Sequence, residues 1–232
     1  MSQQDLFPID LASVDHILNT TRSVRLRLDL EREIPRETIE QVLEISLQAP
    51  TGANTQTWRF LVVTDPEIKS GIADYYRKGA EVYIADQTGM TQTGVSATRE
   101  FSVDDMRTAQ KEGVMNSSMF LLENMQNVPA MIIPCIESRF EDEMPFVQAS
   151  MYGSILPATW SLMLAFRARR IASAWTSLHL VYEKEVRELV GMPDNFTQAA
   201  LLPIAWLKGG ELHKAKRLPL SEVAYWDRWG QW

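Results

Sequence analysis

Two short segments carry side chains whose types and spacing suit an anionic ligand. In the first, Arg22 and Arg25 flank Ser23 and Val24. Guanidinium groups bind phosphate oxygens in pairs, and a serine hydroxyl or a backbone N–H can complete the set of donors. Taken alone, however, this segment fits a solvated charged turn better than an anion site.

The second segment, residues 49–58, runs from the expected end of a helix into an expected strand. Pro50 ends the helix, and Gly52, after Thr51, allows the backbone to come close to a flat ligand. Asn54 and Gln56 supply amide donors and acceptors. An ordinary helix–strand connection contains the same turn-forming residues, so this segment alone leaves both interpretations open.

Other common active-site chemistries have no counterpart in the sequence. It contains no G-x-G-x-x-G, no G-x-x-x-x-G-K-[ST], no H-E-x-x-H and no G-x-S-x-G motif. The three histidines are far apart, which disfavours a zinc site. Cys135, the only cysteine, lies in the apolar run I-I-P-C-I and is expected to be an inert core thiol. Hydrolase and metalloenzyme functions therefore lack support.

The composition is that of one globular, acidic domain. With 23 Lys and Arg against 30 Asp and Glu, the formal net charge of the 232 residues is −7. A nucleic-acid partner is not expected, because duplex binding needs a basic surface. No apolar run approaches the roughly 18–20 residues of a membrane-spanning helix, and no secretory signal is evident. We expect no membrane partner and a cytoplasmic location.

Periodicity predicts helices that alternate with about four strands in one α/β or α+β domain. Expected helices follow Asp10, span 36–49, 67–87, 106–127, 147–169 (with a kink or restart at Pro157) and 183–190, and expected strands span 58–64, 130–137, 172–177 and 198–207. The first helix has apolar residues at helical spacing. Residues 88–105 are polar and aperiodic, which suggests a mobile lid or disorder.

The motifs together resemble those of the FMN-dependent nitroreductase family. R-S-V-R near the N-terminus is followed by a helix and then by A-P-T-G-A-N-T-Q-T-W, which leads into a strand. Later motifs in the same order are I-A-S-A-W-T-S-L-H, L-V-G-M-P, A-L-L-P-I and K-R-L-P-L. The resemblance covers residues 11 to 229. Each motif is weak alone, but their common order is specific.

The resemblance implies an α+β fold, a sandwich whose central, mostly antiparallel sheet is flanked by helices. It implies an intertwined homodimer with two FMN molecules in the subunit interface. The whole chain, 1–232, would be one FMN-binding domain with a mobile lid at about 80–110 and a C-terminal arm at about 210–232. Three of the seven tryptophans lie in this arm, where packing against the other subunit is expected.

The resemblance also implies a role for each segment, with no catalytic side chain beyond the cofactor. Arg22, Ser23, Val24 and Arg25 would bind the FMN phosphate and the pyrimidine side of the flavin. Arg217 would add a second cation on the phosphate. Pro50, Thr51, Gly52 and Asn54 would touch the FMN bound mainly by the other subunit, and Trp175, Thr176 and Ser177 would lie along the isoalloxazine.

The implied reaction is ping-pong hydride transfer from NAD(P)H through flavin N5 to nitroaromatics, quinones or related small electrophiles. A reductive dehalogenase or ene-type reductase would share the cofactor residues, and a non-catalytic flavin-binding or storage protein is a further alternative. Arg170 and Ala172 stand where relatives often have glycines, which keeps that last alternative open.

Overall fold

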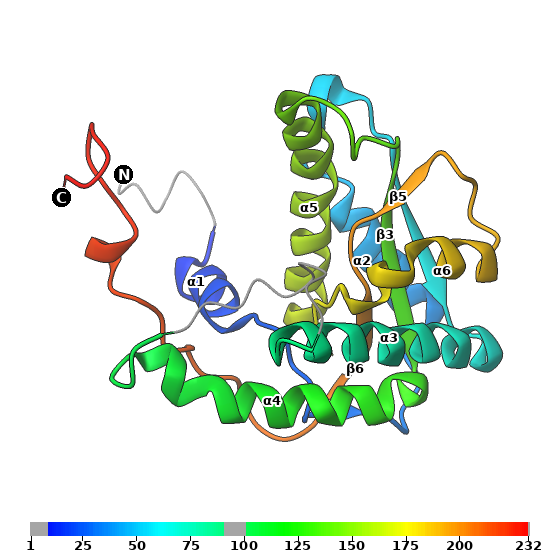
Figure 1. Cartoon of the computed structure of the whole chain (residues 1–232), viewed down its shortest axis with the longest axis horizontal. Helices are drawn as coiled ribbons and strands as arrows, with labels where there is room; N and C mark the ends of the chain where they lie inside the picture. Colours follow the sequence, from blue (N-terminus) through cyan, green and yellow to red (C-terminus); the bar gives the residue numbers. More distant parts are fainter. Residues whose placement is uncertain (1–8, 91–100, 232) are drawn as a thin grey trace.

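The computed structural model describes residues 9–90 and 101–231 of the chain (Figure 1). Its helices are α1 (Leu11–Thr20), α2 (Arg36–Ser46), α3 (Pro66–Gln87), α4 (Met106–Asn124), α5 (Pro145–Ala168) and α6 (Glu183–Leu189). Its strands are β1 (Leu28–Asp29), β2 (Trp58–Val63), β3 (Ala130–Glu137), β4 (Ile171–Ser173), β5 (Phe196–Gln198) and β6 (Leu202–Leu207). The expected lid overlaps the end of α3 and the start of α4, and its residues 91–100 lie outside the described part.

All strand pairings of the described sheet are antiparallel. The order is β1-β6-β3-β2, with β4 also paired to β6 and β5 to β3. The four predicted strands correspond to β2, β3, β4 and β6, but the count was too low. β1 and β5, of two and three residues, are too short to produce a periodic pattern. The α+β class with a mostly antiparallel sheet is confirmed.

Helices cover both faces of the sheet and make two main cores (Figure 1). On one face, α2 and α5 pack over β3, β4 and β6 around Val42, Leu162 and Phe166, each fully buried. On the other face, α3, α6 and the end of α4 pack around Ile72 and Leu121. Nearly all residues of β3 are buried, whichever face of the sheet they point to, as expected for a central strand that helices cover on both sides.

α5 is apolar around its whole circumference and runs through Pro157 without a break, so the expected restart was wrong. Its inner face packs on the sheet, whereas Tyr152 and Trp160 are exposed on the outer face. Helices that are apolar all round are normally covered on every side. The described chain therefore leaves part of α5 uncovered.

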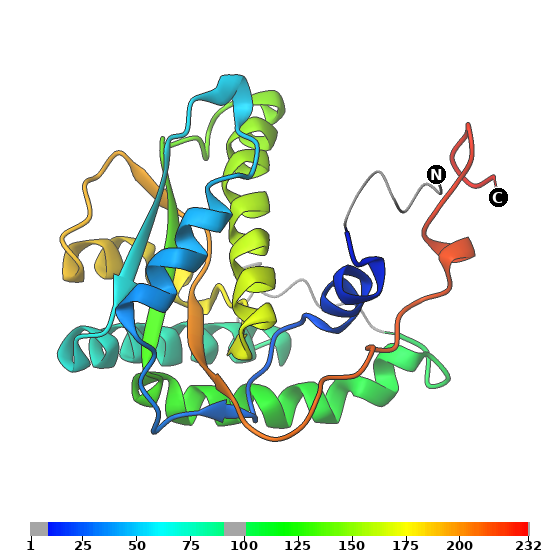
Figure 2. The same cartoon turned by 180° about the vertical axis from the view of Figure 1, so that it is seen from behind.

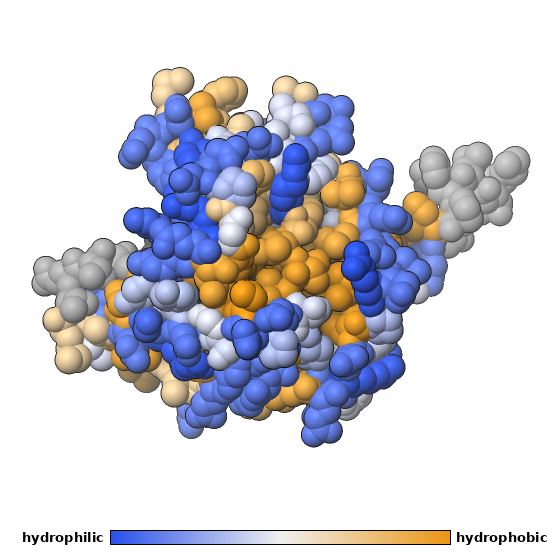
Figure 3. Space-filling model, turned by 90° about the vertical axis from the view of Figure 1, so that its right-hand side faces the viewer, coloured by the Kyte–Doolittle hydropathy of each residue, from blue (hydrophilic) through white to orange (hydrophobic). Residues whose placement is uncertain are grey.

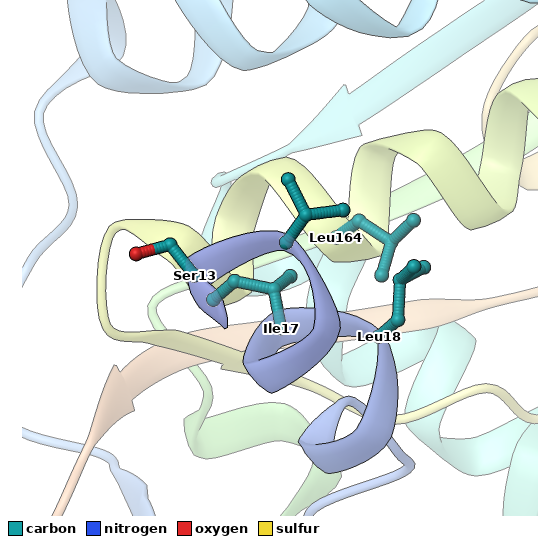
Figure 4. Close-up of a pocket in the computed structure, with 5 residues that line it drawn as sticks. Ser13, Ile17, Leu18 and Leu164 are labelled. Atoms are coloured by element: carbon teal, nitrogen blue, oxygen red, sulfur yellow. The ribbon is translucent and has the colours of Figure 1, made fainter. Parts of the chain in front are cut away.

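α1 begins at its predicted cap, where the Asp10 carboxylate accepts from the Ala12 N–H at 3.1 Å. Its apolar side, however, is not buried: Leu11 is 66% exposed and Leu18 is 50% exposed. Its contact with the body is shallow, with Ile17 and Leu18 facing Leu164 of α5 (Figure 4).

Leu212 is buried in the core, whereas the C-terminal residues after it and α1 extend away from the body (Figures 1 and 2). Trp229 of this arm is 91% exposed and Trp226 is 69% exposed. Among the described residues, the Trp229 ring stacks only on Tyr225, with 4.9 Å between ring centroids. The large aromatic residues of the described arm thus have no core of their own chain to pack in.

The start of the arm is fixed to the C-terminus of α5. Arg167 is buried and donates to the Glu211 carboxylate at 2.9 Å and to the Thr20 hydroxyl at 3.3 Å. Arg170 also pairs with Glu211 at 3.2 Å. Arg167, in the last turn of α5, therefore joins this helix to α1 and to the start of the arm, in addition to offsetting the helix macrodipole.

We expect Glu211→Gln to lower the melting temperature by several degrees, because it removes the carboxylate that pairs with the buried Arg167. Thermal unfolding measures the change. Glu188→Gln is the control, because Glu188 is exposed and lies 3.9 Å from Lys184. Equal melting temperatures for the two variants would contradict the proposed anchoring.

His179 gives a second prediction, because its ring is fully buried and neither nitrogen has a hydrogen-bond partner among the described residues. Burial, only partly offset by nearby Gln198, lowers the pKa of His179 to about 3. The unfolded chain takes up this proton near pH 6.5, so the free energy of unfolding should fall from pH 6.5 downward, by at most about 1.4 kcal/mol per pH unit. Urea unfolding at several pH values measures it. His179→Leu should flatten this dependence, and an unchanged slope would contradict the assignment.

Candidate active site

The first predicted segment and the stretch after β4 lie side by side. The Val24 N–H donates to the Ser173 carbonyl at 2.9 Å, and the Trp175 N–H donates to the Ser23 hydroxyl at 2.8 Å. The second bond joins residues that are 152 positions apart in the chain. Two of the predicted groups of site residues are thus brought together.

Arg25 has an incomplete set of partners in this region. One guanidinium nitrogen, Nη1, donates to Ser117 of α4 at 3.4 Å. Its Nε is buried and has no hydrogen-bond partner within residues 9–90 and 101–231. A buried donor of this kind is costly unless a ligand or water satisfies it. The region therefore fits an anionic group.

The other two predicted cations lie at the edge of this region. Arg22 donates to the His213 carbonyl at 2.6 Å, which ties it to the base of the arm. Arg217 follows His213 by four residues, is exposed, and donates to the neighbouring Lys216 carbonyl at 3.1 Å. The bond to His213 thus brings Arg22 to the stretch of the arm that carries Arg217.

The three residues after β4 differ in how far they are open to a ligand. The Thr176 side chain is buried, and its hydroxyl donates to the Tyr76 hydroxyl at 3.3 Å. Trp175 is half-buried against the α5 side of the sheet, and Ser177 is exposed. Trp175 and Ser177 are accordingly more open to a ligand than Thr176.

The second predicted segment lies near the opposite end of α5. The Gly52 N–H donates to the Ser154 hydroxyl of α5 at 2.9 Å. Pro50 and Asn54 are exposed, Thr51 is half-buried, and the Gln56 amide donates to the Asn54 side chain at 3.1 Å.

This loop also has an unusual backbone. Ala53, Asn54 and Gln56 all have left-handed φ angles, of 50°, 55° and 52°. Such angles are uncommon outside glycine and cost free energy unless the surroundings hold them. Contacts such as the Gly52–Ser154 hydrogen bond must therefore hold the loop in this conformation.

One chain does not bring the two segments together. The 50–54 segment contacts α5 at Ser154, whereas Thr20, just before Arg22, contacts α5 at Arg167. The helical residues between these two contacts correspond to roughly 20 Å along the helix axis. Figures 1 and 2 agree, with the two segments near opposite ends of α5.

The two substituted glycine positions behave differently. Arg170 has a φ of 60°, a left-handed angle that explains why glycine suits this position. Its side chain compensates by donating to the Gly209 carbonyl at 3.0 Å. Ala172 is buried within β4 and pairs with Ala205. The contacts of both residues therefore lie with the sheet and the base of the arm.

Sequence reasoning missed Tyr76 and Ser117, which contact Thr176 and Arg25. Both belong to long helices, where an isolated Tyr or Ser gives no signal beyond helical spacing.

The remaining reactive candidate, Cys135, is buried, and burial raises the pKa of its thiol to about 12, as expected for an inert core residue.

Two absences concern only the described part of the chain. Within residues 9–90 and 101–231, no three His, Cys, Asp or Glu side chains are grouped so as to hold a metal ion. Nor is any helix in those ranges both long and apolar enough to cross a bilayer.

Solved structures share this fold. The FMN-dependent nitroreductase NfnB from Mycobacterium smegmatis, in complex with NADPH, superposes with a TM-score of 0.67 at 21% identity, over 94% of this chain and 100% of that chain. An iodotyrosine deiodinase bound to FMN and 3-iodo-L-tyrosine superposes with a TM-score of 0.63 at 17% identity, over 89% and 96%.

Sequence comparison identifies the family. A protein of Archaeoglobus fulgidus, provisionally named NADH dehydrogenase/NAD(P)H nitroreductase, is 23% identical over 197 residues, or 83% of this chain and 84% of that protein. Iodotyrosine deiodinase 1 of Mus musculus is 36% identical over 73 residues, or 32% and 25%. The sequence profile of the nitroreductase family matches residues 18–206. The chain therefore belongs to the nitroreductase family, as the order of its motifs predicted.

Proposed function

We propose that this protein is an NAD(P)H-dependent oxidoreductase that binds FMN and reduces nitroaromatics, quinones or related electrophiles. The observation that carries the proposal is the buried Nε of Arg25, unpartnered within the described chain, beside Ser23 and the 173–177 segment. An arginine keeps its charge at all relevant pH values and suits a phosphate or an electron-rich ring edge. The names of the relatives agree with this chemistry.

The proposed site is completed by a second copy of the chain. Arg22, Ser23, Val24 and Arg25 of one subunit bind the phosphate and pyrimidine side, and Arg217 supports the phosphate. Pro50, Thr51, Gly52 and Asn54 come from the other subunit, because within one chain they lie roughly 20 Å away along α5. Homodimerisation is thus part of the proposal.

Three uncovered surfaces support a homodimer. The outer face of α5 and the tryptophans of the arm are exposed. β2 is an edge strand within the described sheet, and its central residues Phe60, Leu61 and Val62 are only partly buried. Figure 3 shows the side of the molecule that lies on the right in Figure 1. An apolar area bordered by polar side chains is visible there. Exposed edges and apolar areas of this kind are typical of interaction surfaces.

Bound FMN would supply the hydride chemistry, so the chain itself needs to bind and orient and not to act as nucleophile. Arg22 and Arg25 hold the charged end through fixed positive charges. A positive charge beside the pyrimidine side favours the reduced, anionic state of a flavin. Trp175 provides an apolar surface that excludes water, and the exposed Ser177 offers a hydrogen-bonding hydroxyl next to it.

Reductive dehalogenation is the second candidate, because several sequence relatives are named iodotyrosine deiodinases. Such an enzyme is expected to clamp a zwitterionic substrate with a Glu, a Tyr and a Lys near the lid. Glu81 and Tyr83 are two residues apart on α3 and so point about 200° apart around the helix. Lys111 lies on α4 and is exposed. Glu81 and Tyr83 therefore face different sides of α3 and would not clamp one substrate together, which favours nitro or quinone substrates.

Purified protein should be yellow or become yellow with added FMN. Arg22→Ala and Arg25→Ala should each weaken FMN binding by about 1.5–3 kcal/mol, the range for a charged hydrogen bond, and Arg217→Ala should act in the same direction. Fluorescence titration measures the dissociation constants. Arg36→Ala is the control, because Arg36 is exposed and pairs with Glu40 on α2, away from the site. Unchanged affinity in all three site variants would show that the cofactor site lies elsewhere.

Catalysis and substrate class can be separated in two assays. In rapid-mixing experiments, NADH or NADPH should bleach the bound flavin. If neither nucleotide bleaches it, a storage protein is favoured.

The rate of steady-state turnover of nitrofurazone should exceed the rate for a halotyrosine. The reverse order would favour the dehalogenase.

A further inference from the structure

Tyr76 of α3 places a buried hydroxyl directly behind the candidate site. The residue is 2% exposed, and its hydrogen bond among the described residues is with the Thr176 hydroxyl at 3.3 Å. A buried tyrosine hydroxyl needs a hydrogen-bond partner, and here that partner belongs to the candidate site. The contact joins α3 to the stretch that follows β4.

Both backbone polar groups of Thr176 and the N–H groups of the two residues before it are hydrogen-bonded. The Ala174 N–H donates to the Pro203 carbonyl at 3.2 Å, and the Trp175 N–H donates to the Ser23 hydroxyl. Thr176 and Leu201 exchange both backbone bonds, at 3.1 and 2.8 Å. Its side chain is the remaining polar group of Thr176, and Tyr76 holds it.

α3 itself cannot shift toward this stretch at low cost. Gly79, one turn after Tyr76 on α3, packs directly against the backbone of Leu178. A Cβ at Gly79 would overlap the Leu178 carbonyl oxygen. Leu178 directly follows Ser177 in the chain. The helix that carries Tyr76 is therefore fitted closely against the end of the 175–177 stretch.

The charge of Arg25 also acts on Tyr76. Burial raises the pKa of Tyr76, and the hydrogen bond to Thr176 and the positive charge of Arg25 partly offset this rise. Tyr76 thus remains a neutral hydroxyl near pH 7, while the buried Nε of Arg25 has no partner in the described chain. Both residues approach the same region, from α3 and from the N-terminal segment.

We propose that Tyr76 is a positioning residue of the flavin site, which holds Thr176 so that Trp175 and Ser177 face the ligand in one fixed arrangement. This inference rests on the proposed function. Tyr76 does not touch the cofactor in this scheme, and its effect passes through Thr176. Loss of the hydroxyl leaves the Thr176 oxygen buried without a partner and frees the 175–177 stretch to rearrange.

The test is a double-mutant cycle on the full-length protein with FMN as the probe. The variants are Tyr76→Phe, Thr176→Val and the two combined, with Tyr75→Phe as the matched control, because the Tyr75 ring packs on Tyr182 outside this contact. The readouts are the FMN dissociation constant, the visible circular dichroism of bound FMN, and the melting temperature of the FMN-free protein.

We expect Tyr76→Phe to raise the FMN dissociation constant roughly tenfold and to change the visible circular dichroism of the flavin. Thr176→Val should act similarly, and the double variant should bind FMN about as weakly as each single variant, without an additive loss. The double variant should regain the melting temperature lost by Tyr76→Phe, because it leaves no orphaned hydroxyl. Tyr75→Phe should match the unmodified chain.

Wild-type affinity and circular dichroism in Tyr76→Phe would overturn the inference and leave the proposed function intact. Additive effects of the two substitutions on FMN binding would overturn it as well. If Tyr76→Phe fails to fold, the double variant decides the matter, because full FMN affinity there would show a purely structural role. Absence of FMN binding in the unmodified chain would overturn the proposed function and the inference together.

Discussion

The candidate site depends on two hydrogen bonds that join the N-terminal arginine segment to the end of β4. Val24 donates to the Ser173 carbonyl, and Ser23 accepts from the Trp175 N–H. Without them, Arg25 would be a charged residue in a surface loop. With them, its guanidinium is held beside the sheet, with one buried donor that no described residue satisfies. Two distant segments of the chain are thereby joined into one candidate binding region.

α5 determines how the rest of the proposed site can be assembled. The 50–54 loop contacts its Ser154, and the N-terminal segment reaches its Arg167. A helix is a rigid spacer, so a single chain cannot close this separation. The same helix leaves an apolar outer face uncovered, and the arm leaves its tryptophans exposed. A second copy would both cover these surfaces and bring the 50–54 loop to the first copy's arginines.

Local signals in the sequence predicted most elements, because helix caps and turn-forming residues act over a few positions. Asp10 caps α1, Gly191 follows α6 with a φ of 66°, and β3 has the expected bounds. Spacing could not show that the apolar side of α1 lacks cover within the described chain, nor that Val114 of α4 is 54% exposed. Tyr76 could not be found either, because its role depends on a contact 100 residues away.

The central claim is that each FMN site takes its arginines from one subunit and its 50–54 loop from the other. Mixed dimers of two defective chains test it most directly, one carrying Arg22→Ala and Arg25→Ala and the other carrying the bulky substitution Thr51→Trp. Each chain alone should bind no FMN at a concentration that saturates the unmodified protein. The purified mixed dimer should recover one FMN per two chains, because one of its two sites is intact. No recovery in a properly formed mixed dimer would contradict the claim.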